Sequence, residues 1–416
     1  MFIDYSIRQL NKDNQILCGD NVEVIKNKDN TIIVLSDGLG SGVKANISST
    51  YTKIIISKML SNGSDLESII NTLSKTLPTC QTRNIAYSTF TVVQIFKDLR
   101  IKVIEFGNPG IFYIHKGKNK PYESKLVELS GKEINISEFK LHKDDYLVIA
   151  SDGLVHAGRG GQEHAGLLHA GWGRNKVAEF IEASLKENGE PEILAEKLVY
   201  YAELLEQGRV CDDISVVAVR IREPRILNIA VGPPAIKNKD EEMSRAFVNT
   251  SGKKIVCGGT TSKIIAKAMN TKVRTVVSRG NLPSKVEIQG IDLATEGLIT
   301  LTRAVDIIEN LNTYTNRRKN QVELHNIYSI YRKRDIFNEL LTKMPDKIEY
   351  IPEDPAEELV IELKKADKIN FFIGMAKNYS YQKLDIPYKP EFKFELIEKL
   401  QNILINIGKE VCATYY

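Results

Sequence analysis

The feature that most constrains this chain is a carboxylate that ends an apolar run and is followed by three glycines. The run Ile32–Leu35 leads through Ser36 to Asp37, and Gly38–Gly42 then precedes a long stretch with helical spacing. Glycine adopts positive φ without steric cost, so the backbone there can approach a ligand closely. The start of a helix also presents unpaired N–H groups to anions. This junction therefore predicts a strand, a turn and a helix around a metal or phosphate site anchored by Asp37.

Three more acidic residues lie at the edges of apolar runs. Asp152 follows the run Tyr146–Ala150, and Asp212 stands just before another run. Asp20 closes the short run Ile16–Leu17, which we expect to be a strand. Carboxylates at several strand ends can meet at one edge of a sheet, and Mg²⁺ or Mn²⁺ takes oxygen ligands of this kind. The four aspartates therefore predict a site for hard divalent cations.

Length and composition indicate a soluble protein of two domains. The chain has 416 residues, of which 42% are hydrophobic and 26% charged, and its formal net charge is only +4. This small and scattered charge predicts no nucleic-acid partner. No apolar run is long enough to span a bilayer and no signal-peptide pattern begins the chain, so we expect a cytoplasmic protein without a membrane partner. The five cysteines are widely spaced, which indicates free thiols.

The first 223 residues place strands between two pairs of helices. Helical spacing, in the first case carried by Val43, Ile47 and Tyr51 among others, covers 43–60, 66–77, 175–186 and 192–207. Short connections predict sequential antiparallel strands at 88–96, 101–106, 111–115, 126–129 and 146–150, with a closing strand at 212–222. We expect a two-layered β-sandwich with helices packed outside it, because every apolar face then finds a partner.

Residues 224–416 read as a separate α/β domain, because strands and helices alternate there. The expected strands are 226–231, 254–257, 369–373 and 411–415, and the expected helices are 240–249, 263–269, 302–311, 322–341, 355–365 and 392–407. The junction Gly258–Ser262 joins a strand to a helix and would surround an anion with hydroxyls and free N–H groups. Its Thr and Ser residues could instead cap the helix. A small anionic ligand at Gly258–Ser262 is therefore a candidate partner, and the role of this domain stays open.

Five segments occur in a fixed order within residues 1–223. They are Cys18–Asp20, Val34–Gly42, Glu105–Gly110, Ile149–Gly153 and Asp212–Val216. Together they resemble the stage II sporulation protein E type of bacterial serine/threonine phosphatase, within the metal-dependent protein phosphatase 2C superfamily. The resemblance implies an α+β protein, with an αββα sandwich at 1–223 followed by the second α/β domain at 224–416. It also implies metal-dependent hydrolysis of phosphoserine or phosphothreonine in a phosphoprotein substrate, in bacterial signalling or regulation.

The resemblance also implies a role for each acidic residue. By position, Asp37 would bridge two Mn²⁺ or Mg²⁺ ions, the carbonyl of Gly38 would bind one of them, and Asp152 and Asp212 would complete the centre. Asp20 would join the metal site through water. Two metals near each other lower the pKa of a bridging water, so that hydroxide exists near neutral pH and no protein nucleophile is required. The catalytic residues would then be Asp37, Asp152 and Asp212.

One departure from the family pattern leaves other functions open. Many superfamily members carry a His after Asp-Gly as general acid, whereas this chain has Leu39. The leaving group would then be protonated by metal-bound water or another residue, with His156 as a candidate. Without that acid, the domain could be a catalytically weak switch or scaffold that binds a protein partner. A small-phosphoester phosphatase is a further alternative, and a homodimer is a candidate assembly.

Overall fold

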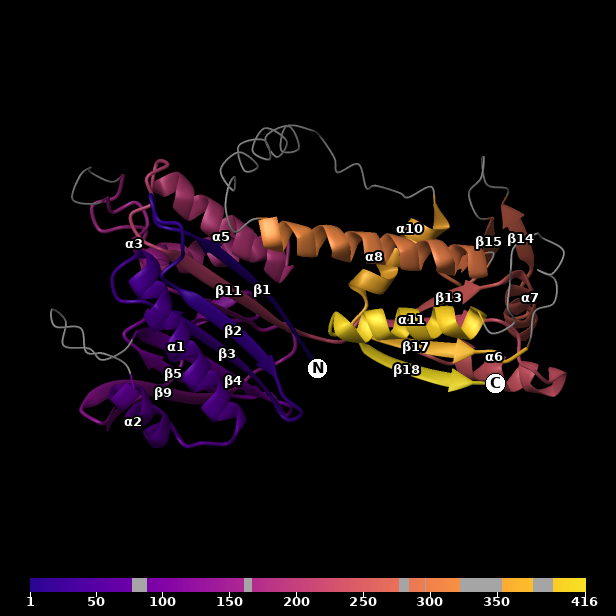
Figure 1. The fold of residues 1–416 in the computed structure, drawn as a ribbon, viewed down its shortest axis with the longest axis horizontal. Coiled ribbons are helices and arrows are strands. Elements are labelled where there is room, and N and C mark those ends of the chain that lie inside the picture. The colour runs from indigo at the N-terminus through magenta and orange to yellow at the C-terminus, as the bar shows by residue number, and fades with distance from the viewer. Residues whose placement is uncertain (77–87, 161–166, 277–283, 296, 322–353, 377–391) are drawn as a thin grey trace. The chain divides into compact units, whose positions relative to one another are not determined.

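The chain forms two compact units, Met1–Glu223 and Pro224–Tyr416. The computed structural model describes residues 1–76, 88–160, 167–276, 284–295, 297–321, 354–376 and 392–416 (Figure 1). The predicted helix at 322–341 lies outside these residues. Within the described ranges, each helix is too short or too polar to cross a lipid bilayer.

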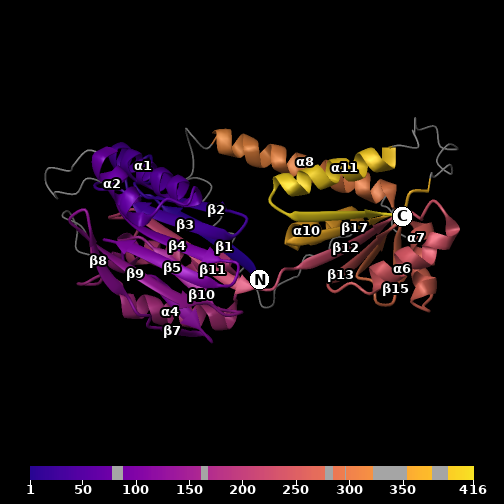
Figure 2. The same ribbon diagram turned by 90° about the horizontal axis from the view of Figure 1, so that it is seen from below.

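The N-terminal unit is built on two antiparallel sheets (Figures 1 and 2). One sheet has the order β1 (Phe2–Leu10), β11 (Ile214–Arg222), β10 (Tyr146–Ala150), β6 (Phe112–His115) and β7 (Lys118–Lys120). The other has the order β2 (Asn21–Lys26), β3 (Asn30–Asp37), β4 (Thr89–Phe96), β5 (Arg100–Phe106), β9 (Lys132–Lys140) and β8 (Lys125–Leu129). The helices of this unit are α1 (Gly42–Ser61), α2 (Leu66–Thr76), the short α3 (Asp152–His156), α4 (Arg174–Glu187) and α5 (Pro191–Leu205).

Strand β3 shows how the layers form. Its side chains alternate between two apolar clusters, because successive residues of a strand point to opposite faces. Ile33 and Leu35 join the cluster between the two sheets. Ile32 and Val34 join the cluster beneath α1 and α2, and a third cluster packs α4 and α5 against the first sheet. The predicted αββα sandwich is thus confirmed.

The predicted order of sequential strands is wrong at Gly107–Gly110. Strand β5 pairs with β4 and β9, whereas β6 pairs with β10 and β7 in the other sheet. The turn therefore carries the chain across the sandwich. Gly107 adopts φ +76° there, and a Cβ at this position would clash with Thr89.

Two further predictions for this unit are wrong. The run Ile16–Leu17 is no strand, and Ile16 is 88% exposed, so Asp20 precedes β2 instead of closing a strand. In α1, the apolar residues Val43, Ile47 and Tyr51 are 60%, 50% and 54% exposed. The helix instead buries a face of small residues, which allows it to lie close to β2 and β3: Gly42, Ala45, Ser49, Thr52 and Ser57, together with Ile56.

The C-terminal unit contains one seven-stranded sheet. Its order is β14 (Val273–Val276), β15 (Lys285–Ile288), β16 (Leu293–Thr295), β13 (Lys253–Cys257), β12 (Ile226–Val231), β17 (Lys368–Ile373) and β18 (Glu410–Tyr415). Five neighbouring strands are parallel, namely β16, β13, β12, β17 and β18. Strands β14 and β15 add an antiparallel edge. This is the α/β architecture predicted for residues 224–416, although β14, β15 and β16 were not predicted.

Helices cover both faces of this sheet (Figure 2). One apolar cluster holds α8 (Leu298–Gln321), α10 (Pro355–Lys365) and α11 (Phe392–Asn406). The other holds α6 (Asp240–Val248), which follows the 3₁₀ turn η1 (Lys237–Lys239), and α7 (Gly259–Ala268). The helices that follow the neighbouring strands β13 and β16 therefore lie on opposite faces.

Candidate metal centre

The acidic residues of the N-terminal unit meet at one edge of the sandwich. Asp37 is the last residue of β3, Asp152 opens α3 directly after β10, and Asp212 lies just before β11. Because β10 and β11 are antiparallel neighbours, the end of one lies beside the start of the other. The carboxylate of Asp37 lies close enough to Asp20, Asp152 and Asp212 to be repelled by all three. The structure thus brings together the four aspartates named from the sequence.

Two glycines allow the loops around Asp20 and Asp37 to touch. The N–H of Gly38 donates a hydrogen bond of 3.2 Å to the carbonyl oxygen of Gly19. A Cβ on Gly38 would clash with the backbone carbonyl of Ala45, and one on Gly19 would lie 2.8 Å from Asp213 Oδ2. Only glycine fits at either position without movement of the loops. That the carbonyl of Gly38 binds an ion stays a prediction.

Asp213 is a structural anchor that sequence reasoning did not identify. It is buried, its Oδ2 accepts a hydrogen bond of 2.9 Å from the N–H of Gly19, and its Oδ1 accepts one of 2.9 Å from the N–H of Lys12. Both oxygens are thereby directed at the backbone of the segment that leads to Asp20. No local sequence signal distinguishes Asp213 from its neighbour Asp212, because the partners lie about 200 residues earlier in the chain.

Burial and repulsion between carboxylates disfavour ionisation of Asp20, Asp37 and Asp212. Desolvation, followed by repulsion from Asp20, Asp152 and Asp212, raises the pKa of Asp37 to about 10. Desolvation also raises the pKa of Asp20 to about 7, against the opposing hydrogen bonds of two serine side chains. For Asp212, desolvation and then repulsion from Asp152 raise the pKa to about 6. Such crowded carboxylates are stabilised when a cation lies between them.

The donor set fits hard divalent cations. Oδ2 of Asp20 is buried and has no hydrogen-bond partner within the described part of the chain. The donors that converge here are carboxylate oxygens, the ligands that Mg²⁺ and Mn²⁺ prefer. Asp20, Asp37, Asp152 and Asp212 could therefore hold such ions.

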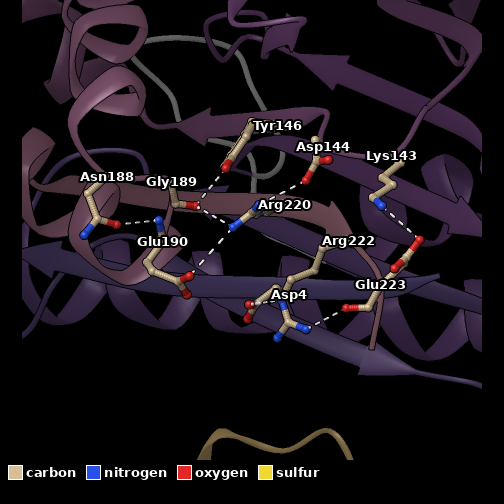
Figure 3. Close-up of polar contacts among 10 residues, drawn as sticks. All are labelled: Asp4, Lys143, Asp144, Tyr146, Asn188, Gly189, Glu190, Arg220, Arg222 and Glu223. Atoms are coloured by element: carbon tan, nitrogen blue, oxygen red, sulfur yellow. Dashed lines mark hydrogen bonds and ion pairs between the residues drawn. The ribbon is translucent and has the colours of Figure 1, made fainter. Parts of the chain in front are cut away.

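At the opposite end of β1, β10 and β11, arginine side chains neutralise the carboxylates (Figure 3). There Arg220 donates a hydrogen bond of 3.0 Å to Asp144, and Arg222 donates one of 2.7 Å to Asp4. No arginine or lysine side chain in the described ranges hydrogen-bonds any of the four aspartates of the centre. The chain thus supplies hydrogen-bonded arginines at one end of the sandwich, whereas at the other end Lys12 acts on Asp212 only through its charge.

A second group of metal-ligating side chains lies away from this centre. His115, His142 and Asp145 have ligand atoms within 4.8 Å of one another. Asp145 stands at the start of β10, whereas Asp152 follows its end. The Asp145 carboxylate is already hydrogen-bonded, to His115 Nδ1 at 2.7 Å and to the hydroxyl of Tyr113 at 3.0 Å. This group therefore fastens the ends of β6 and β10.

Two residues bear on protonation of the leaving group: Leu39, which replaces the family's general acid, and the candidate acid His156. Leu39 is half-buried beside Gly38, and His156 is exposed at the end of α3. A role for His156 as general acid stays a prediction.

Comparisons with known proteins find relatives of the N-terminal unit. The family model described as Stage II sporulation protein E (SpoIIE) matches residues 27–222. The chain is 28% identical over 214 residues to Stage II sporulation protein E of Bacillus subtilis (strain 168), covering 50% of this chain and 24% of that protein. It is 28% identical over 156 residues to the phosphoserine phosphatase RsbX of the same organism, covering 36% of this chain and 73% of that protein.

Among solved structures, the chain is similar to the PP2C phosphatase domain of SpoIIE from Bacillus subtilis with a fragment of its regulatory domain. The identity is 21%, the TM-score is 0.44, and the match covers 53% of this chain and 64% of that one. The chain thus spans about a quarter of the full-length SpoIIE protein that it matches. The family match includes Asp37, Asp152 and Asp212 but begins after β1, Asp20 and β2. Residues 27–222 are therefore similar to the SpoIIE family over most of the sandwich.

Proposed function

We propose that the N-terminal unit is a Mn²⁺- or Mg²⁺-dependent phosphatase that hydrolyses phosphoserine or phosphothreonine in a protein substrate of a bacterial signalling system. The observation that carries this proposal is the convergence of Asp20, Asp37, Asp152 and Asp212 at an edge where no lysine or arginine of the described residues hydrogen-bonds them. The similarity to RsbX, which is named a phosphoserine phosphatase, supports this class of substrate.

Each aspartate has a distinct part in this proposal. Two divalent cations in the centre would lower the pKa of a bound water and screen the charge of the substrate phosphate. Asp37 would contact both ions, and its repulsion from Asp20, Asp152 and Asp212 supports this role. Asp152, Asp212 and the carbonyl of Gly38 would complete the ligands, and Asp20 would contact an ion through water. Cations would have to displace protons from Asp20, Asp37 and Asp212, whose pKa values are raised, so metal affinity should increase with pH.

The direct test is hydrolysis by the full chain with Mn²⁺, with Mg²⁺ and with EDTA. The substrates are p-nitrophenyl phosphate and a phosphoserine peptide. We expect turnover that requires metal and that falls by more than about 100-fold in Asp37→Asn, because even outer-shell partners of metal ligands contribute 10–100-fold. Asp144→Asn, an aspartate at the opposite end of the sandwich, is the matched control and should keep full activity.

The other outcomes discriminate the alternatives. Turnover of p-nitrophenyl phosphate alone would favour a small-phosphoester phosphatase. No turnover of either substrate with either ion would favour a switch or scaffold. Full activity in Asp37→Asn would refute the assignment of the centre.

The proposed assembly is a homodimer that uses the exposed face of α1. Val43, Ile47 and Tyr51 form an exposed apolar stripe on this helix, and such stripes mark interaction sites more often than scattered apolar residues do. Light scattering of the full chain should give the mass of a dimer, and Ile47→Glu should give a monomer. A monomer without substitution would contradict this proposal.

Two further proposals concern location and the second unit. A cytoplasmic location is supported by the free thiols of Cys18, Cys211, Cys257 and Cys412, since such thiols persist in reducing compartments. For the C-terminal unit, we propose a small anionic ligand at Gly258–Ser262.

A further inference from the structure

Two helices of the C-terminal unit begin side by side at the carboxyl edge of its sheet. Helix α7 follows β13 and α8 follows β16, and these strands are parallel neighbours. Gly258 precedes α7 and Gly297 precedes α8, and a Cβ on Gly297 would lie 3.0 Å from the Cα of Gly258. Helices α7 and α8 go to opposite faces of the sheet, so their first turns diverge from this edge. Ligands of doubly wound α/β folds bind at such a point.

Within the described residues, the first turns of both helices have backbone N–H groups without a helical acceptor. In α7 the first intrahelical bond runs from Ser262 N–H to Gly258 O at 2.8 Å, and in α8 it runs from Leu301 N–H to Gly297 O at 3.0 Å. The three N–H groups that precede each of these donors have no helical acceptor. Both helix dipoles also place partial positive charge here. One edge thus combines two sets of donors with two positive helix ends.

Each helix also carries a buried hydroxyl without a partner. Thr261 and Thr300 both occupy the third position of their helices, and both are fully buried. Neither hydroxyl has a hydrogen-bond partner within the described residues. The hydroxyl of Thr261 faces the loop, since a Cβ on Gly258 would lie 3.2 Å from it. Leaving such groups unpaired is unfavourable, and a bound anion would supply acceptors.

The entrance to α7 is open. Gly259 and Thr260 are exposed, and a Cβ on Gly259 would meet no atom within 4 Å. An anion can therefore reach the free N–H groups of the first turn, and the rest of a ligand can extend into solvent. Helix capping alone would not require this opening.

We propose that the C-terminal unit binds the phosphate group of a small phosphorylated molecule between the first turns of α7 and α8, at Gly258–Thr260 and Gly297–Thr300. A tetrahedral dianion makes use of two sets of N–H donors, whereas a carboxylate carries less charge and fewer acceptors. This inference rests on the anion site proposed for the C-terminal unit and is independent of phosphatase activity in the N-terminal unit.

The test is calorimetric titration of the full chain with inorganic phosphate in EDTA, with sodium acetate as the comparison. EDTA keeps the four aspartates of the N-terminal unit free of metal, so that phosphate is repelled there. We expect phosphate to bind with millimolar or better affinity and acetate at least about tenfold more weakly. No heat with phosphate at 10 mM would overturn the proposal. Equal binding of acetate would leave the small-anion site intact but refute the phosphate assignment.

Three substitutions separate binding from folding. Gly259→Asp places a carboxylate where the anion would sit, yet an acidic residue in the first turn of a helix stabilises it. Phosphate affinity should therefore fall at least about tenfold, the loss expected when hydrogen bonds to a charged group disappear, while the melting temperature is kept or raised. Thr261→Val and Thr300→Val should each weaken binding about threefold or more without destabilising the free protein, because their hydroxyls have no partner there.

The matched control is Thr271→Val, just past the opposite end of α7. Its hydroxyl is also buried and unpartnered within the described residues, but it lies away from the proposed site. Affinity for phosphate should stay within about twofold of the unsubstituted chain. Unchanged affinity in Gly259→Asp, or equal losses in Thr271→Val and Thr261→Val, would refute the site.

Discussion

The backbone N–H of Gly38 hydrogen-bonds the carbonyl oxygen of Gly19 at 3.2 Å. This contact joins the residue after Asp37 to the residue before Asp20, and so it fixes the distance between two carboxylates of the acidic centre. No side chain fits at position 38, because a Cβ would clash with the carbonyls of Ala45 and Gly19. The distance between the Asp20 and Asp37 carboxylates therefore depends on Gly38, a residue without a side chain.

Gly38→Ala should destabilise the N-terminal unit and reduce its metal-dependent activity. Overpacking of this kind costs about 1–3 kcal/mol, which lowers the melting temperature by roughly 2–4 °C per kcal/mol for a unit of this size. The fluorescence of Trp172, the single tryptophan of the chain, reports unfolding of this unit because the residue is buried there. Gly259→Ala is the control, since a Cβ fits freely at that position. An equal melting temperature for both variants would contradict the steric argument.

The metal-free protein should lose stability as the pH rises. The pKa values of Asp37, Asp20 and Asp212 are raised from 3.8 to about 10, 7 and 6. The folded state therefore holds these protons more tightly than the unfolded state, and their contribution is complete below about pH 4 and is lost progressively up to about pH 10. Urea unfolding in EDTA at pH 5, 7 and 9, followed by Trp172 fluorescence, measures this trend. Stability that increases from pH 5 to pH 9 would contradict it.

Asp37→Asn should stabilise the metal-free protein while it removes activity. The amide cannot ionise, so it escapes the repulsion from Asp20, Asp152 and Asp212. At pH 8 in EDTA we expect the melting temperature to rise by at least about 2 °C, equivalent to roughly 0.5–1 kcal/mol, with a weaker dependence on pH. Residues selected for function commonly show this opposition between activity and stability. A fall in the melting temperature would indicate that Asp37 has a structural role instead.

Asp213→Asn should have the opposite effect on stability. One of its oxygens would be replaced by an NH₂ group that faces the N–H of Gly19 or Lys12, both of which are donors. A buried donor left without an acceptor costs about 1–3 kcal/mol. Thermal unfolding of both variants measures this difference: the melting temperature should fall in Asp213→Asn and rise in Asp37→Asn. A gain of stability in both variants would refute the anchoring role of Asp213.

The sequence predicted elements well where an apolar run is continuous and ends in turn residues. Strands β10 and β12 begin and end as predicted, and for the same reason Asp37 ends a buried strand and Asp152 follows one. The strand β1 was missed, although the alternation of Ile3, Tyr5 and Ile7 with polar residues is a readable strand signal.

Other features depend on contacts that no local pattern contains. The turn Gly107–Gly110 has the composition of a hairpin, and only the pairing of β6 with β10 shows that it crosses between sheets. The apolar stripe of α1 predicts a buried face, but close packing of Ala45 and Ser49 on the sheet turns Val43 outward. The convergence of Gly258 and Gly297 was equally hidden, because it arises from the parallel pairing of β13 and β16.

The pairing of β1 with β11 has a consequence for synthesis of the chain. Their register runs from Phe2 opposite Arg222 to Leu10 opposite Ile214, so β1 leaves the ribosome long before its partner strand β11 is made. At about 5–20 residues per second, this delay is roughly 10–40 s. During that interval β10 also lacks its neighbour β11, and the sheet beneath α5 is incomplete. A pause in translation before β11 would therefore prolong exposure of an apolar sheet to chaperones and to other nascent chains.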